Sequence, residues 1–139
     1  MGFSYVAAVA ILLSSSLIFF GMVYSDYVQS NVQINGAESQ MTHQNYEYLN
    51  SNANITGYNV TTSNLTDTVT VNITNTGSIT FNLNKTTVLL NGTIIQFNYS
   101  SEYLFPLESG NITFQSQPGN ESLEIVYNTG YKEYVELSV

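Results

Sequence analysis

The first 25 residues constrain the chain most, because they contain no Asp, Glu, Lys, Arg or His. Two apolar blocks, Val6 to Leu13 and Leu17 to Tyr24, lie within this stretch. As a helix, Phe3 to Tyr24 would be ~33 Å long, which is enough to cross the hydrocarbon core of a bilayer. The serines between the blocks can bond to carbonyls one turn back and so remain satisfied in lipid. Residues 1–25 are therefore predicted to form a transmembrane helix.

Such a segment has several possible fates. A cleaved secretory signal has a basic n-region and a shorter apolar core. This segment has no basic residue, and its apolar run is too long for such a signal. A buried helix of a soluble protein would need a larger surrounding core than a chain of 139 residues supplies. A permanent membrane anchor and the core helix of a filament both remain open, since each needs a long helix with little charge.

The charge balance excludes several partners. Lys85 and Lys132 are the only cations among side chains, against ten acidic residues, and the net charge is −8. Nucleic acids and anionic lipid surfaces need clustered cations, so neither is expected as a partner. The first charges after the helix are acidic, beginning with Asp26, and the only cation at the other end is the terminal amine, which together favour a cytoplasmic N-terminus and an exterior C-terminal domain. The chain has no cysteine, which excludes disulfides and thiolate chemistry.

Residues 26–51 are predicted to continue the helix and then form a linker. Tyr24, Val28 and Val32 recur at a spacing of four, which is typical of one helix face. Gly36 is expected to kink or interrupt the helix, with a second helical piece ending near Leu49. The composition of residues 51–57, SNANITG, indicates a linker or first turn.

Residues 52–139 change to a period of two and are predicted to form an all-β immunoglobulin-like sandwich. Asp67 to Asn75 alternates apolar and polar side chains, as a strand with one buried face does. Asn91-Gly92 predicts a tight hairpin, because both residues tolerate positive φ. The other expected strands are residues 79–83, 86–90, 93–99, 102–105, 111–115, 122–127 and 131–139.

Asparagine sequons are unusually frequent in this region. Chance would give about three Asn-x-Ser/Thr motifs among its 13 asparagines, and nine occur. Their abundance predicts glycosylation at several sites and a domain outside the cell. The candidate sites are Asn54, Asn59, Asn64, Asn72, Asn84, Asn91, Asn98, Asn111 and Asn120.

The chain offers little for catalysis. His43 is the only histidine, so no histidine-based triad or metal set can be built. Glu121 with Glu124, and Glu133 with Glu136, are spaced by three, which places them on opposite faces of a strand. No enzyme activity, metal or cofactor is expected.

Tyrosines are the most suggestive side chains for binding. Tyr24 and Tyr27 lie where an aromatic belt would meet the membrane boundary. Tyrosine is favoured both in interfaces and as an ordinary half-buried strand residue, and both interpretations remain open. The candidate interface residues are Tyr99, Tyr103, Tyr127, Tyr131 and Tyr134.

The start Met1-Gly2-Phe3-Ser4 running into the apolar helix resembles the archaellum accessory protein F (FlaF) family of the type IV pilin-like superfamily. The segment Val69 to Ile95 is similar to that family's strand, Asn-x-Gly turn and strand pattern. Leu104 to Gly110 is similar to its Pro-Gly turn, and Leu123 to Tyr134 to its last hairpin. The resemblance covers almost the whole chain.

The resemblance implies a single-span protein of the archaeal membrane. Its immunoglobulin-like domain would lie in the pseudo-periplasm, bind the S-layer protein and act in the stator of the swimming motor. Archaellum protein G, the motor complex and copies of the chain are the other implied partners. Archaellins and pilins carry a Lys/Arg-Gly cleavage site before the helix, whereas this chain has Met1-Gly2. That departure favours an anchored accessory protein over the alternative, a filament subunit with bundled helices and glycosylated β-domains outside.

Overall fold

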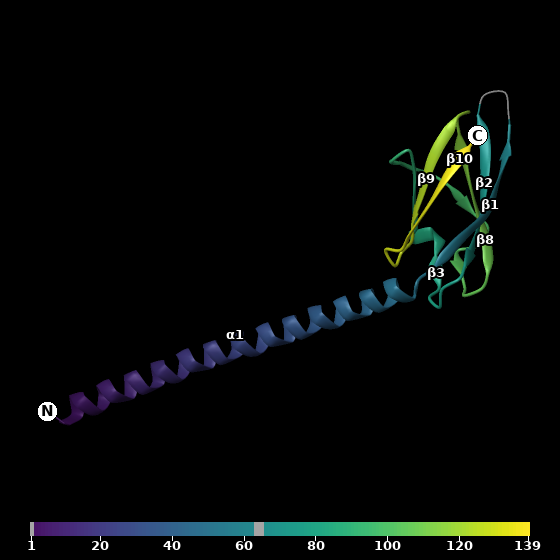
Figure 1. Cartoon of the computed structure of the whole chain (residues 1–139). Coiled ribbons are helices and arrows are strands. Elements are labelled where there is room, and N and C mark those ends of the chain that lie inside the picture. The colour runs from purple at the N-terminus through teal and green to yellow at the C-terminus, as the bar shows by residue number, and fades with distance from the viewer. Residues whose placement is uncertain (1, 63–65) are drawn as a thin grey trace. The chain divides into compact units, whose positions relative to one another are not determined.

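A computed structural model describes residues 2–62 and 66–139. The chain forms two units, residues 1–43 and 44–139, which are described separately below. The predicted fold class, a long N-terminal helix followed by an all-β sandwich, is confirmed (Figure 1). The elements are α1 Gly2–Asn50, β1 Ala53–Thr61, β2 Asp67–Asn75, β3 Phe81–Asn82, the 3₁₀ helix η1 Leu83–Lys85, β4 Thr87–Leu90, β5 Thr93–Ile95, β6 Asn98–Tyr99, β7 Tyr103–Leu104, β8 Ser109–Ser116, β9 Asn120–Val126 and β10 Lys132–Ser138.

Helix α1 is one uninterrupted element, and none of its residues is buried. The expected interruption at Gly36 is wrong, because a single glycine costs a helix only about 1 kcal/mol and the flanking residues are helix-compatible. The expected linker at residues 51–57 is also wrong, since β1 begins at Ala53. The linker was inferred from local composition, but residues 53–57 pair with β2 at Ala53, Asn54, Ile55 and Gly57 and so form the start of a strand.

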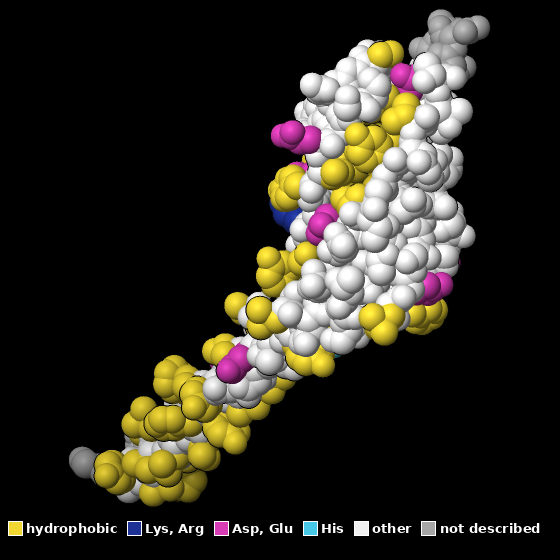
Figure 2. Space-filling model, turned by 45° about the vertical axis from the view of Figure 1, so that its right-hand side comes forward, with side chains coloured by type: hydrophobic (Ala, Val, Ile, Leu, Met, Phe, Trp, Pro, Cys, Tyr) yellow, Lys and Arg dark blue, Asp and Glu magenta, His cyan; other side chains and the backbone are white. Residues whose placement is uncertain are grey.

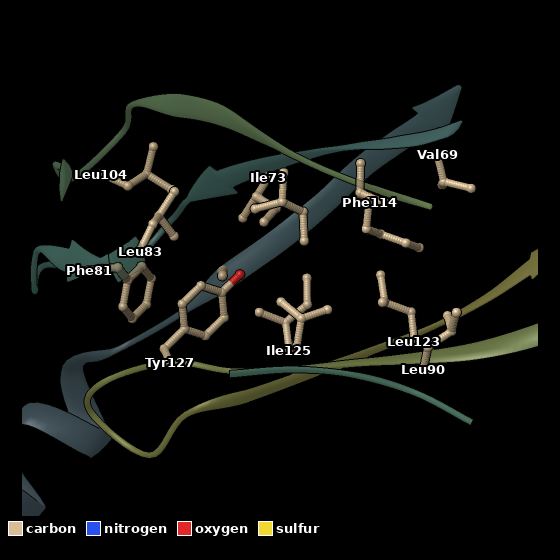
Figure 3. Packing of buried hydrophobic residues seen from close by; sticks show 14 of the residues in the cluster. Val69, Ile73, Phe81, Leu83, Leu90, Leu104, Phe114, Leu123, Ile125 and Tyr127 are labelled. Carbon is tan, nitrogen blue, oxygen red and sulfur yellow. The ribbon is translucent and has the colours of Figure 1, made fainter. Parts of the chain in front are cut away.

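Two four-stranded antiparallel sheets form the sandwich. One has the order β1-β2-β8-β6 and the other β10-β9-β4-β5, while β3 and β7 make a separate pair. The predicted alternation of residues 67–75 is confirmed: Val69, Val71 and Ile73 are fully buried and face the other sheet. Figure 3 shows side chains of the two sheets meeting in one layer, with Phe114 opposite Leu123 and Ile73 above Ile125.

The Asn91-Gly92 hairpin is confirmed. Both residues have positive φ, 50° and 78°, and they join β4 to β5 with Leu90 opposite Thr93. The strand expected over residues 93–99 is instead divided, because β5 pairs with β4 whereas β6 pairs with β8 in the other sheet. The strand expected over residues 79–83 becomes β3 followed by η1, whose first turn is capped by the Asn82 side chain.

The turn after β2 closes against the chain that leads into β1. The amides of Thr76 and Gly77 both donate to the Asn52 carbonyl at 2.9 Å, and that of Ser78 donates to the Asn50 carbonyl at 3.0 Å. A β-carbon on Gly77 would lie 2.5 Å from the Asn52 nitrogen and 2.7 Å from the Asn50 oxygen. Glycine is therefore required at this position by close backbone contact.

We expect Gly77→Ala to destabilise the β-domain by about 1–3 kcal/mol, because backbone atoms must move to admit the methyl group. Urea unfolding of the full-length protein in detergent, followed by circular dichroism, measures this. Gly57→Ala is the matched control, since nothing lies within 4 Å of its added β-carbon. Equal stability of the two variants would contradict the close packing described for Gly77.

Candidate functional site

The charge-free part of α1 is the first candidate surface. Its apolar side chains are exposed in the single chain, including Leu13, Leu17 and Phe20. The predicted serine bonds are confirmed: the Ser14 and Ser15 hydroxyls donate to the carbonyls of Ile11 and Leu12 at 3.0 Å. The helix is long and apolar enough to cross a membrane. Its side chains therefore need a cover, and lipid or other helices can supply it.

The predicted tyrosine interface is only partly available. The prediction that Tyr127 is an interface residue is wrong. Its side chain is 2% exposed, and its ring stacks on Phe81 with ring centroids 4.2 Å apart. Its hydroxyl points into the core (Figure 3) and has no hydrogen-bond partner among the described residues, and burial raises its pKa well above the ordinary value. Tyr127 therefore stabilises the fold and cannot contact a partner.

The other four tyrosines lie in different places. Tyr131 is half-buried beside Tyr127, with centroids 6.1 Å apart. Tyr99 on β6 and Tyr103 on β7 are exposed, but they belong to different sheets. Tyr134 on β10 is the most accessible of the set, at 64% exposure. Of the five predicted interface tyrosines, only Tyr127 and Tyr131 therefore lie together. Tyr99, Tyr103 and Tyr134 lie apart from them on β6, β7 and β10.

Tyr134 belongs to a charged cluster on the outer face of β9 and β10. Its hydroxyl donates to Glu124 Oε1 at 2.7 Å, and Lys132 Nζ lies 3.0 Å from the same oxygen. The Tyr134 hydrogen bond, and next the Lys132 hydrogen bond, lower the pKa of Glu124. The bond to Glu124 raises the pKa of Tyr134, and the same carboxylate raises that of Lys132.

Apolar side chains continue this face away from the cluster. By register, Leu89 on β4 lies opposite Glu124, and Ile94 on β5 lies opposite Leu89. Ile94 is 71% exposed. We call this surface the β9–β10 face; its residues are Thr87, Leu89, Ile94, Ser122, Glu124, Val126, Lys132, Tyr134 and Glu136. It combines an aromatic side chain, aliphatic side chains and an ion pair, which is a composition suited to protein contacts.

We expect Tyr134→Phe to raise the Glu124 pKa toward its ordinary value of 4.5, because the largest cause of the lowering is removed. A carboxyl with a depressed pKa contributes stability that is present above its unfolded pKa and is lost as pH falls through the folded pKa. The cluster should therefore weaken on the acid side, below about pH 4.5. NMR titration of the Glu124 carboxyl carbon checks this, with Tyr99→Phe as control; a Glu124 pKa of 4.5 in the unmodified protein would contradict it.

The long edges of the two sheets are tied to each other by side chains. The Tyr131 hydroxyl lies 3.0 Å from Asn52 Oδ1, and the Glu133 carboxylate bonds to the backbone of Ile55 in β1. In the other direction, the Ser138 amide donates to the Tyr58 hydroxyl at 3.1 Å. Burial raises the Glu133 pKa. Backbone groups at the edges of β1 and β10 are thus partly occupied, which makes these edges poor sites for strand addition.

The candidate sequons occupy one face preferentially. Five lie on the strands of the β1-β2-β8-β6 sheet, at Asn54, Asn59, Asn72, Asn98 and Asn111. Asn84 is in η1, Asn91 is in the β4–β5 turn and Asn120 begins β9, whereas Asn64 lies outside the described residues. Figure 2 shows a broad white area, without charged or apolar side chains, on the right of the β-domain, where β1, β2 and β8 lie.

No three His, Asp or Glu side chains in residues 2–62 and 66–139 come together as metal ligands. A shallow hollow of about 580 Å³ is lined by Tyr58, Asn91, Glu121 and Glu136, among others. The Ser116 hydroxyl donates to Glu121, so that carboxylate serves the fold.

Reasoning from the sequence missed the Glu124–Lys132–Tyr134 cluster. The spacing of Lys132 and Tyr134 places them on one face of a strand, which is a usable signal. Their approach to Glu124 depends on the register of β9 and β10, which pairs Tyr134 with Glu124. That register depends on the geometry of the turn over residues 127–131, which strand alternation alone does not give.

Comparison with known proteins adds no identification. No protein-family model matches this chain, and no curated protein matches it.

Proposed function

We propose that the protein is a membrane-anchored accessory component of the archaellum, whose exterior β-domain binds the S-layer and resists the torque of the motor. The observation that carries this proposal is the charge-free apolar segment of α1, which is exposed on all sides in the single chain. Residues 2–25 would be ~36 Å long, close to the thickness of a bilayer core. Lipid would cover these side chains and hold the chain in the membrane.

The β9–β10 face supports the proposal that the β-domain binds the S-layer. It presents Tyr134, Leu89 and Ile94 beside the ion pair of Lys132 with Glu124. A rigid sheet face suits a load-bearing contact better than a loop, because its four strands are joined by three ladders of hydrogen bonds. The resemblance to the archaellum accessory family assigns this contact to the S-layer, with protein G and the motor complex as further partners.

Binding to the S-layer can be tested with the full-length protein in lipid vesicles. Vesicles carrying the protein should sediment with isolated S-layer sheets, and Tyr134→Asp with Ile94→Asp should weaken this association at least tenfold, since the face would lose its central apolar contacts. Thr70→Asp on the opposite sheet is the matched control. Equal sedimentation with and without S-layer sheets would overturn the proposed contact.

A filament subunit is the second candidate, and the length of α1 favours it. The helix continues for 25 residues beyond Ser25, and Val28, Val32, Ile34 and Met41 remain exposed along it. Such a helix could pack against copies of itself, with the β-domains outside. The two functions differ in where the protein is found after filaments are sheared from cells.

A further inference from the structure

Five sequon asparagines share one outward face of the β-domain. On β2, Val69, Val71 and Ile73 point into the core, so Thr70, Asn72 and their even-numbered neighbours point outward. Cross-strand partners lie on the same side of a sheet. The register pairs Asn54 with Thr74, Asn59 with Thr70, Asn72 with Asn111, and Asn98 with Thr113. We call the outer surface that carries these five asparagines the asparagine face.

The rest of the asparagine face is polar and uncharged. Its other side chains are Thr61, Thr68, Thr70, Thr74, Ser109, Thr113 and Gln115. Hydroxyl pairs connect neighbouring strands, Thr70 with Thr113 at 3.3 Å and Thr74 with Ser109 at 2.8 Å. The β9–β10 face, in contrast, carries both charges and exposed apolar side chains. The two outer faces of the sandwich therefore differ in chemistry.

Asparagines inside and outside sequons are used differently. Within residues 52–139, the four asparagines outside sequons all make side-chain hydrogen bonds within the protein: Asn52, Asn75, Asn82 and Asn128. Of the eight sequon asparagines in the described residues, Asn91 alone does so, by accepting from the Ser122 amide at 2.9 Å. Folding therefore does not require the amides of the asparagine face.

An outward strand that alternates Asn and Thr can generate sequons without any modification. That explanation accounts for the spacing, but it does not account for why, apart from Asn91, the asparagine side chains that make hydrogen bonds within the domain lie outside sequons. Attached sugars would also hydrate a domain whose sequence has few charged residues. The asparagine face is built so that a glycan would displace no internal bond.

We propose that the asparagine face is an N-glycan-bearing face, with glycans on Asn54, Asn59 and Asn98 and on one of Asn72 or Asn111 in each molecule. Asn54, Asn59 and Asn98 lie on edge strands and are exposed. Asn72 and Asn111 lie opposite each other on the two central strands and are half-buried. Their β-carbons are about 5 Å apart, so two glycans there would overlap.

The modification is a group transfer from a lipid-linked sugar phosphate. The asparagine Nδ2 forms a bond to the anomeric carbon of the first sugar, and the bond from that carbon to the phosphate oxygen breaks. The phosphate leaves as an anion, and a base of the transferase takes the amide proton. The Ser or Thr two residues later completes the acceptor motif.

Glycopeptide mass spectrometry of the full-length protein, purified from the cells that make it, tests this site by site. We expect glycans at Asn54, Asn59 and Asn98, and site occupancies of Asn72 and Asn111 that together do not exceed one glycan per molecule. In the Asn72→Gln variant, occupancy of Asn111 should rise. Unmodified asparagines across this face would overturn the proposal, even if Asn84, Asn91 or Asn120 carried glycans.

A triple variant, Asn54→Gln, Asn59→Gln and Asn98→Gln, provides the second measurement. It should lose the mass of three glycans while keeping the circular dichroism spectrum of the unmodified sequence. Full loading of both Asn72 and Asn111 in one molecule would overturn the exclusion between them. This proposal goes beyond the function proposed above and fails separately from it, because an unglycosylated protein found in the membrane would refute only the glycan-bearing face.

Discussion

Replacing Asn75 with alanine is expected to lower the free energy of unfolding of the β-domain by about 3–4 kcal/mol. Asn75 is fully buried at the end of β2. Its Nδ2 donates to the carbonyls of Ile79 at 2.8 Å and Leu104 at 2.9 Å, and its Oδ1 accepts from the Gly77 amide at 3.0 Å. Truncation removes all three bonds and leaves polar backbone groups buried without a partner.

Urea unfolding of the full-length protein in detergent, followed by circular dichroism, measures this effect. Asn72→Ala is the control, because Asn72 lies on the same strand with its side chain outward and makes no side-chain bond that would be lost. We expect the control to change stability by less than about 0.5 kcal/mol. Similar losses for the two variants would show that Asn75 does not hold the turn as described.

Placing two lysines in the apolar segment is expected to remove the protein from membranes. Each of Leu13→Lys and Leu17→Lys places a charge near the middle of the span, at a cost of about 2.5–3.5 kcal/mol. Together they should lower the equilibrium constant for membrane insertion by more than about a thousandfold. Carbonate-washed membranes from cells that make each variant, probed for the protein, measure the loss.

Val32→Lys with Ile34→Lys is the matched control for charge. Both residues lie on the same helix but beyond the charge-free segment, and both are exposed. This variant should stay in the washed membranes at the level of the unmodified chain. Retention of the Leu13 and Leu17 double variant at that level would mean that lipid does not cover this segment.

Side-chain periodicity predicted the parts of the fold that depend on local physics. The alternation of Val69, Val71 and Ile73 indicated β2 and its buried face, because only one side of that strand can avoid water. Asn91-Gly92 indicated the hairpin, because few other pairs adopt positive φ twice. The candidate sequons came directly from the sequence, although their gathering on one face did not.

Tertiary pairing decided what local patterns could not. Residues 51–57 have the composition of a turn, yet β2 offers them a ladder and they form the start of β1. Tyr127 follows Leu123 and Ile125 at the spacing of one strand face, so alternation places it with buried residues; its assignment to an interface rested on residue type alone, and its ring instead stacks on Phe81. The contact of Tyr134 with Glu124 depends on register between strands, which is fixed by the whole sheet.

The measurement that tests the central claim most directly is the location of the protein after cells are sheared. Membranes and sheared filaments would be separated by sedimentation, and the protein would be quantified in each. A membrane-anchored accessory component predicts that it stays in the membrane pellet while filaments are released. Recovery of the protein mainly in the filament fraction, as a repeating subunit, would contradict the anchored function and identify the protein as a filament subunit.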